Sequence, residues 1–306
     1  MTLKRAKNNH DGSKTLEDTM SESNSYAQMN HPLPHREEHA RFNREFFKAI
    51  EQRSSLRLAA LLRDPHHMSR CNLNALAPSF PQQTPLQAAL SSTGSPQGLA
   101  KLLIPLSDPN VLDAHGESAL MIAANKGLSS HCKALLKEGA DASATNHCGQ
   151  TPLIIAAKYG NPATVSALLP HSNPSHQCKL GYTAMMESIK RLDRVHDRDG
   201  RGPSKNAQTW RRLIASADFK IADINGDTAL HHAALSCGRW PVDLAAELLA
   251  ILLSRSNLEA LDNDGDTATS VALRTAPATL SMLFEQAELD AMAEPSMAVK
   301  RKARSL

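Results

Sequence analysis

Aromatic residues, paired cysteines and long apolar runs are all scarce in this chain of 306 residues. Aromatic residues form 4% of the sequence and hydrophobic residues 41%, so the core must be built from Ala, Leu, Ile and Met. The five cysteines include no CxxC pair, a pattern more typical of a reducing compartment than of a disulfide framework. No apolar run approaches the length of a membrane span, and residues 1–20 lack the apolar stretch of a signal peptide. These absences predict a soluble, intracellular protein.

The chain also lacks a concentrated charge and a recognisable catalytic constellation. Its net charge of +3 is too small to indicate nucleic-acid binding unless the basic residues gather on one face. The fourteen histidines are scattered, and none pairs with Cys, Asp or Glu at a spacing typical of metal sites or catalytic triads. His66 and His67 are expected to lie in a loop without a convergent partner. We therefore expect no catalytic residue, no cofactor and no metal, which argues against an enzyme.

One twelve-residue phrase recurs along the chain with small changes. It is clearest at residues 149–160, and near-copies stand at 116–127 and 226–234. The step from Gly116 to Gly149 is 33 residues, and the step from Gly149 to Gly181 is 32. A period of this size indicates a stack of small units, each of which buries its apolar face against its neighbours.

The phrase resembles the signature of the ankyrin repeat, in which a turn glycine precedes Thr-Pro-Leu-His and a pair of alanines. The resemblance covers roughly residues 80 to 285. It implies an all-α ankyrin-repeat solenoid of about five to six helix-turn-helix units, with a helical N-terminal cap and disordered termini. Repeats one to six begin at these residues: Thr84, Ser118, Thr151, Thr183, Thr228 and Thr267.

Composition divides the chain into four segments. Residues 1–40 are polar and predicted to be disordered, and residues 41–78 form the helical cap. The repeat array occupies 79–290, and a basic tail follows at 291–306. Repeat four contains about twelve extra residues, placed in an exposed loop at 193–206, and it has Met186 where the family has His. Repeat five is expected to have a longer loop at 237–241 and a longer second helix.

Two motifs suggest metal binding, but each has a simpler interpretation. His231 and His232 are adjacent, yet His231 occupies the family's Thr-Pro-Leu-His position, where it is expected to form hydrogen bonds within and between repeats. The acidic run 262–267 resembles the start of an EF-hand loop. That loop needs Gly at its sixth position and Glu at its twelfth, where this chain has Thr267 and Leu273. The run is therefore predicted to be the turn of repeat six.

The resemblance implies a binding surface on the concave face, formed by the hairpin tips and the exposed ends of the first helices. Matching positions give these candidate partner-binding residues: His115, Lys126, His147, Gln150, Lys158, Tyr159, Lys179, Tyr182, Lys190 and Arg191. The same positions at the far end are acidic and include Asp227, Asp264 and Asp266. Tyr159, Tyr182 and Arg191 are the expected anchors, because Tyr and Arg are enriched among interface hot spots. The alternative is that these are ordinary solvated surface residues.

The resulting hypothesis is a non-enzymatic protein-protein interaction module or adaptor that binds an acidic segment of a partner. A rival hypothesis is a bacterial effector delivered into host cells, where the repeats bind a host protein. A third is a DNA-associated regulator that acts through the basic tail. We expect a cytoplasmic monomer, with possible nuclear import through the basic clusters at 4–7 and 300–304.

Overall fold

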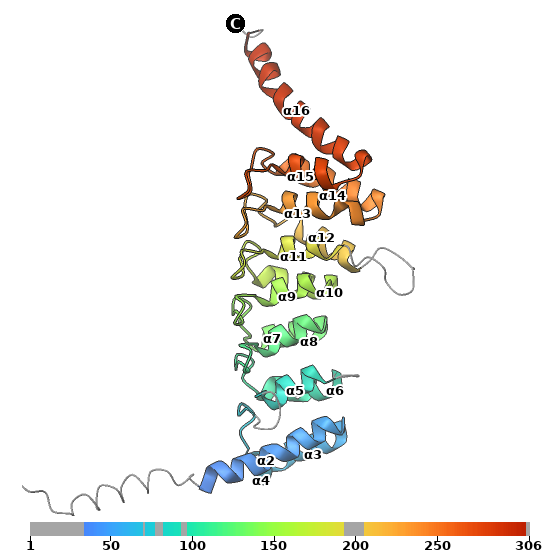
Figure 1. Ribbon diagram of the computed structural model, residues 1–306. Helices are drawn as coiled ribbons and strands as arrows, with labels where there is room; N and C mark the ends of the chain where they lie inside the picture. The colour runs from blue at the N-terminus through green and yellow to red at the C-terminus, as the bar shows by residue number, and fades with distance from the viewer. Residues whose placement is uncertain (1–33, 70, 77–81, 93–96, 193–204, 304–306) are drawn as a thin grey trace, which may run out of the picture.

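The computed structural model describes residues 34–69, 71–76, 82–92, 97–192 and 205–303. Within these ranges the regular elements are helices, and only isolated β-bridges join extended segments, such as the pair Ala222 and Thr228. Figure 1 shows pairs of helices stacked along one axis, with the connecting hairpins on one side of the stack. This arrangement confirms the predicted all-α solenoid. None of the helices in the described ranges is long and apolar enough to cross a membrane.

Two rows of helices make up the stack, and each repeat contributes one helix to each row. The inner row, next to the hairpins, consists of α5 (Pro85–Ser91), α7 (Ala119–Asn125), α9 (Pro152–Lys158), α11 (Ala184–Lys190), α13 (Ala229–Ser236) and α15 (Ala268–Thr275). The outer row consists of α6 (Gln97–Leu103), α8 (Ser129–Lys137), α10 (Pro162–Leu168), α12 (Lys205–Leu213), α14 (Val242–Arg255) and α16 (Ala278–Ala303). Short 3₁₀ turns follow three helices: η1 (Ile104–Leu106), η2 (Leu169–His171) and η4 (Cys237–Arg239).

The signature residues start the inner helices as the sequence predicts. Thr151 has extended backbone and its hydroxyl accepts a hydrogen bond from the backbone N–H of Ile154, which satisfies one of the unpaired donors of the first turn. Thr84 and Gln87 form a reciprocal capping box at the start of α5. The alanine pair of α9, Ala156 and Ala157, is buried, so the neighbouring inner helices can approach closely.

Glycines permit the tight contact between successive hairpins. Gly181 has a φ of +79°, and a Cβ added there would lie 2.6 Å from the Cα of Asp223. Gly149 has a φ of +74°, and a Cβ there would lie 2.9 Å from the backbone nitrogen of Lys179. An L side chain would meet both backbone strain and a steric clash at these positions.

The N-terminal cap is formed by α2 (Pro34–Glu51), α3 (Ser55–Arg63) and the single turn α4 (Pro65–Met68). Helix α2 begins seven residues before Arg41, where the sequence placed the start of order. The sequence also placed His66 and His67 in a loop, which is wrong, because both lie in α4. His67 is buried and stacks on Phe46, so it belongs to the core.

The C-terminal units differ from the others in length. Helix α14 has 14 residues and follows η4, which agrees with the longer loop and helix predicted for repeat five. Helix α16 continues to Ala303, past residue 290 where the array was expected to end. Most of the predicted basic tail therefore continues the last helix. Residues 1–33 with the basic cluster at 4–7, residues 193–204 of the predicted loop, and residues 304–306 lie outside the described residues.

Candidate concave binding face

Backbone hydrogen bonds join the hairpins of repeats two to six into one continuous ribbon. The N–H of His147 donates to the carbonyl of His115 at 3.3 Å. The N–H of Lys179 donates to Cys148 in the next step, at 3.0 Å. Two further steps follow the same plan, from Ile224 to Leu180 at 3.3 Å and from Asn263 to Asn225 at 2.9 Å. The ribbon fixes the spacing of the side chains that the sequence places at the hairpin tips.

A polar side chain at the corner of most hairpins holds the turn in shape. The carboxylate of Asp113 accepts hydrogen bonds from the backbone N–H groups of His115 and Glu117, both at 2.8 Å. The homologous residues Asn146, Asp223 and Asp262 accept the same pair of bonds in repeats three, five and six. These corner residues were not among the predicted functional residues, although each stands three positions before its turn glycine, which is a signal that the sequence contains.

Repeat four lacks the polar corner residue and has Cys178 in its place. Its turn keeps the backbone hydrogen bond from Cys178 to the carbonyl of Tyr182, at 3.0 Å. The amide of Gln177 donates to the carbonyls of Gly181 and Ala222, both at 2.8 Å, and so ties this hairpin to the next one. Gln177 therefore supplies a side-chain connection between the hairpins of repeats four and five.

The candidate partner-binding residues all lie on the hairpins or at the C-terminal ends of the inner helices, and they differ in exposure. Exposed members are His115, Lys126, His147, Tyr159 and Lys179, and half-buried members are Gln150, Lys158, Tyr182, Lys190 and Arg191. Tyr159 is 52% exposed at the end of α9. The ammonium group of Lys158 lies 5.9 Å from the centroid of its ring. Tyr159 is thus available to a partner.

Tyr182 is engaged within the protein. The Nζ of Lys190 lies 3.4 Å from the centroid of its ring, and the ring of His232 meets it edge-on at a centroid distance of 5.5 Å. A cation over an aromatic face is attracted by the ring quadrupole. Tyr182 therefore contributes to a surface that it forms together with Lys190, and its ring is not a free aromatic anchor. The sequence did not indicate this contact.

The C-terminal end of the concave face carries carboxylates in two different states. Burial raises the pKa of Asp227, and the neighbouring carboxylate of Asp223 raises it further. Asp266, at the homologous position in repeat six, forms an ion pair with Arg274. Hydrogen bonds from Arg274 and then Ser270 lower the pKa of Asp266. Only one of the two homologous carboxylates has a basic partner in its own repeat.

The two adjacent histidines have separate roles. His231 Nδ1 caps the helix at Thr228, and its Nε2 lies 3.2 Å from the carbonyl oxygen of Asp266 in the next repeat. This agrees with the hydrogen-bonding role predicted for His231. The Nε2 of His232 lies 3.0 Å from Oδ2 of Asp223.

His232 meets two carboxylates in space, although its spacing from them along the sequence is not typical of a metal site. Possible ligand atoms of Asp223, Asp227 and His232 all lie within 4.8 Å of one another. The contact depends on the hairpin folding back onto the inner helix, which sequence spacing alone does not show.

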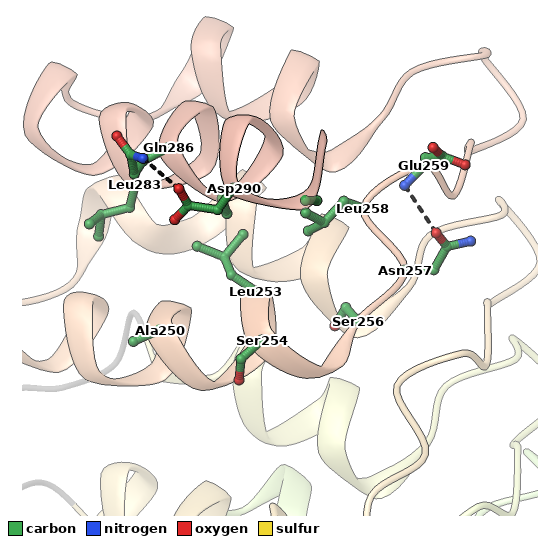
Figure 2. Close-up of a pocket in the computed structure, with 12 residues that line it drawn as sticks. Ala250, Leu253, Ser254, Ser256, Asn257, Leu258, Glu259, Leu283, Gln286 and Asp290 are labelled. Carbon is green, nitrogen blue, oxygen red and sulfur yellow. Dashed lines mark hydrogen bonds between the residues drawn. The ribbon is translucent and has the colours of Figure 1, made fainter. Parts of the chain in front are cut away.

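A separate groove lies in the outer row, between α14, the turn after it and α16. Its volume is about 680 Å³, and Figure 2 shows Leu253 of α14 and Leu283 of α16 among its lining. Its ionisable lining residues are Glu259 and Asp290, and the amide of Gln286 donates a hydrogen bond to Asp290 at 2.8 Å. Ser254 and Ser256 also line this groove.

Comparisons with known proteins agree with this architecture. The description "Ankyrin repeats (3 copies)" matches residues 46–146 and 120–196, and the description "Ankyrin repeat" matches residues 225–263. The chain belongs to the ankyrin repeat family. Ankyrin repeats indicate a protein-protein interaction module, and the fold is typically a non-enzymatic scaffold.

Solved ankyrin structures share the fold at low sequence identity. The ankyrin repeat domain of Bcl-3, described as a unique member of the IkappaB protein family, is 20% identical, with a TM-score of 0.61. That match covers 79% of this chain and 97% of the Bcl-3 domain. EF0377, an ankyrin repeat protein, is 17% identical with a TM-score of 0.52, over 79% of this chain and 96% of that one. At such identities the likeness concerns the fold alone.

Proposed function

We propose that this ankyrin protein is an adaptor that binds an acidic segment of a partner protein across repeats two to four. The observation that carries the proposal is a group of lysines on one face. Lys126, Lys158 and Lys190 lie at the ends of successive inner helices, and Lys179 lies on the hairpin ribbon. In the described part of the chain, none of these four lysines forms an ion pair.

Four lysines gathered on one face favour a partner of opposite charge. Charge complementarity steers the encounter and fixes the register of the bound segment, and its contribution weakens as salt increases. Tyr159 adds a large, half-exposed aromatic surface beside the lysines. Arg191, at the end of α11, adds a planar guanidinium suited to a carboxylate. The expected bound segment therefore combines acidic residues with an apolar side chain that contacts Tyr159.

Affinity purification with the immobilised full-length chain tests the proposal. The chain and its Tyr159→Ala/Arg191→Ala variant would be incubated with extract from the native cell, and bound proteins would be quantified by mass spectrometry. The true partner should be recovered at least tenfold less by the variant, because Tyr and Arg are enriched among the residues that dominate binding energy at interfaces. Its capture by the native chain should also decrease with salt.

Lys133→Ala/Lys137→Ala provides a matched control on α8. Both lysines are exposed on the outer row, so this variant removes two positive charges away from the concave face. It should recover the partner as well as the native chain does. Equal recovery by the native chain and the Tyr159/Arg191 variant would reject the proposed site, and loss with the α8 variant alone would move the site to the outer row.

A further inference from the structure

The hairpins of repeats five and six share one construction but treat their second carboxylate differently. Asp266 of repeat six is neutralised by Arg274, which comes from the last turn of α15. The equivalent position in α13 is Leu235, which cannot neutralise Asp227. In the described part of the chain, Asp227 forms no ion pair with a basic side chain. Asp227 of repeat five therefore lacks the arginine that neutralises Asp266 in repeat six.

Helix α13 instead brings a metal-binding side chain to the same hairpin. His232 occupies the position that is Val271 in repeat six, and it faces Asp223 at the corner of its own hairpin. One possible ligand atom from each of Asp223, Asp227 and His232 lies within 4.8 Å of the others. The convergence involves an imidazole nitrogen and two carboxylates, and it comes from both a helix and a turn.

We propose that Asp223, Asp227 and His232 bind one divalent metal ion of the zinc class. Zinc takes imidazole nitrogen and carboxylate oxygen at about 2.0–2.2 Å, usually with four ligands in all. Ligand atoms that lie within 4.8 Å of one another must move closer to share one ion, and Asp227 is the least buried of the three. The fourth position stays open to water or to a group of a bound partner.

Binding exchanges one interaction of His232 for another. In the contact with Asp223 Oδ2, at 3.0 Å, the Nε2–H donates its hydrogen bond to the carboxylate. Metal binding at Nε2 requires the other neutral tautomer, in which the proton is on Nδ1, so the proton changes nitrogen but the ring keeps it. Oδ1 of Asp223 keeps its hydrogen bonds from the backbone N–H groups of Asn225 and Asp227, so the turn is retained.

Charged groups of both signs surround the cluster. Lys190 opposes a cation here, whereas the carboxylates of Asp262 and Asp264 on the neighbouring hairpin favour one.

A small ion fits this cluster better than a lysine or arginine of a partner protein. The side chain of Asp223 is 0% exposed and that of His232 is 7% exposed. A partner's basic side chain could therefore reach Asp227 but could not contact all three groups together. A metal ion that enters beside Asp227 could.

Isothermal titration of zinc chloride into the full-length chain tests the assignment. The chain has fourteen histidines and five cysteines, so weaker zinc sites are expected elsewhere and the comparison with variants is decisive. Asp227→Asn should abolish one equivalent of binding or weaken it at least tenfold, and His232→Gln should do the same. Asp264→Asn removes an exposed carboxylate from the neighbouring hairpin and should titrate like the native chain.

Two further measurements make the outcome unambiguous. Far-UV circular dichroism should show that Asp227→Asn keeps the helical content of the native chain, as expected for a half-buried turn residue. A large excess of magnesium should not displace the zinc, because magnesium prefers oxygen ligands in octahedral geometry. Identical zinc isotherms for the native chain and Asp227→Asn would overturn the proposal, and so would displacement by magnesium.

Discussion

The middle of the concave face and its C-terminal end use the same backbone plan for different purposes. Lys158 and Lys190 in repeats three and four occupy the helical position that Arg274 occupies in repeat six. Within the described residues the two lysines form no ion pair, whereas Arg274 is bound to Asp266 of its own hairpin. A cation at the same position of different repeats can thus remain available to a partner or be neutralised by a carboxylate of its own hairpin. The residue before the helix-capping Thr decides which applies, and it is Gln150, Tyr182 or Asp266.

The largest expected change in stability comes from substitutions of the hairpin glycines. The hairpin of repeat four is packed against the next hairpin, whereas Gly265 in the hairpin of repeat six has no neighbouring atom within 4 Å. Gly181→Ala should lower the free energy of unfolding by about 3 kcal/mol, because the new Cβ meets both a positive φ and the backbone of the next hairpin. Gly265→Ala has a similar φ of +81° but nothing within 4 Å, so it should cost only about 1 kcal/mol. Urea denaturation of both variants measures the difference, and equal losses would show that hairpin packing contributes nothing.

The next effect concerns the connection between repeats five and six. His231→Ala removes the cap at Thr228 and the contact with the carbonyl of Asp266, and it leaves a cavity in the core. We expect the free energy of unfolding to fall by about 2 kcal/mol. His115→Ala, at an exposed hairpin tip, should change it by less than about 0.5 kcal/mol. If the two variants were equally stable in the same denaturation experiment, the bridging role of His231 would be wrong.

A smaller effect should appear in the dependence of stability on pH. Burial lowers the pKa of His232 below its ordinary value of 6.5 in the folded protein, so the unfolded chain binds more protons between the two values. The contribution of His232 to stability is therefore complete above pH 6.5 and is lost as the pH falls from there to the folded pKa. In His232→Gln the urea midpoint should change less between pH 7.5 and 5.5 than it does in the native chain. An equally steep decline in the variant would indicate that other groups cause it.

The smallest expected change in stability, and the sharpest functional contrast, comes from the repeated cation. Arg274→Ala breaks an exposed ion pair, so neither stability nor capture of an acidic partner should change measurably. Lys190→Ala should also leave stability nearly unchanged, but partner capture should decrease several-fold because the lysine over Tyr182 is lost. Parallel pull-downs measure partner capture by the two variants. An equal decrease with Arg274→Ala and Lys190→Ala would show that the two cations do not differ in their role.

The fold could be predicted because its signals are local. A cap such as Thr151 acts on the first turn of its own helix. A turn glycine such as Gly149 is required by the positive φ of its own position. The start of α2 at Pro34 and the extension of α16 to Ala303 were missed, because the polar composition of both ends resembles that of a disordered segment. His67 was misplaced because its burial depends on Phe46, a residue 21 positions away.

The sequence predicted which positions form the candidate site, but not the exposure or the contacts of the side chains at those positions. Matching positions located Tyr159 and Tyr182 on one face, but the sequence treated them alike. The structure leaves Tyr159 half-exposed and places Tyr182 between Lys190 and His232. These contacts join residues from repeats four and five, and no local pattern specifies a contact between side chains of different repeats.

The sequence by itself determined the repeat, its caps and its turns, because each depends on residues within a few positions of one another. Only the tertiary structure decided how charge is used along the concave face. It left Lys190 without an ion pair, joined Arg274 to Asp266, and brought His232 to Asp223 and Asp227. The physical reason is that Coulomb and metal-ligand interactions depend on distance in space. Stacking the repeats and folding each hairpin onto its helix sets those distances.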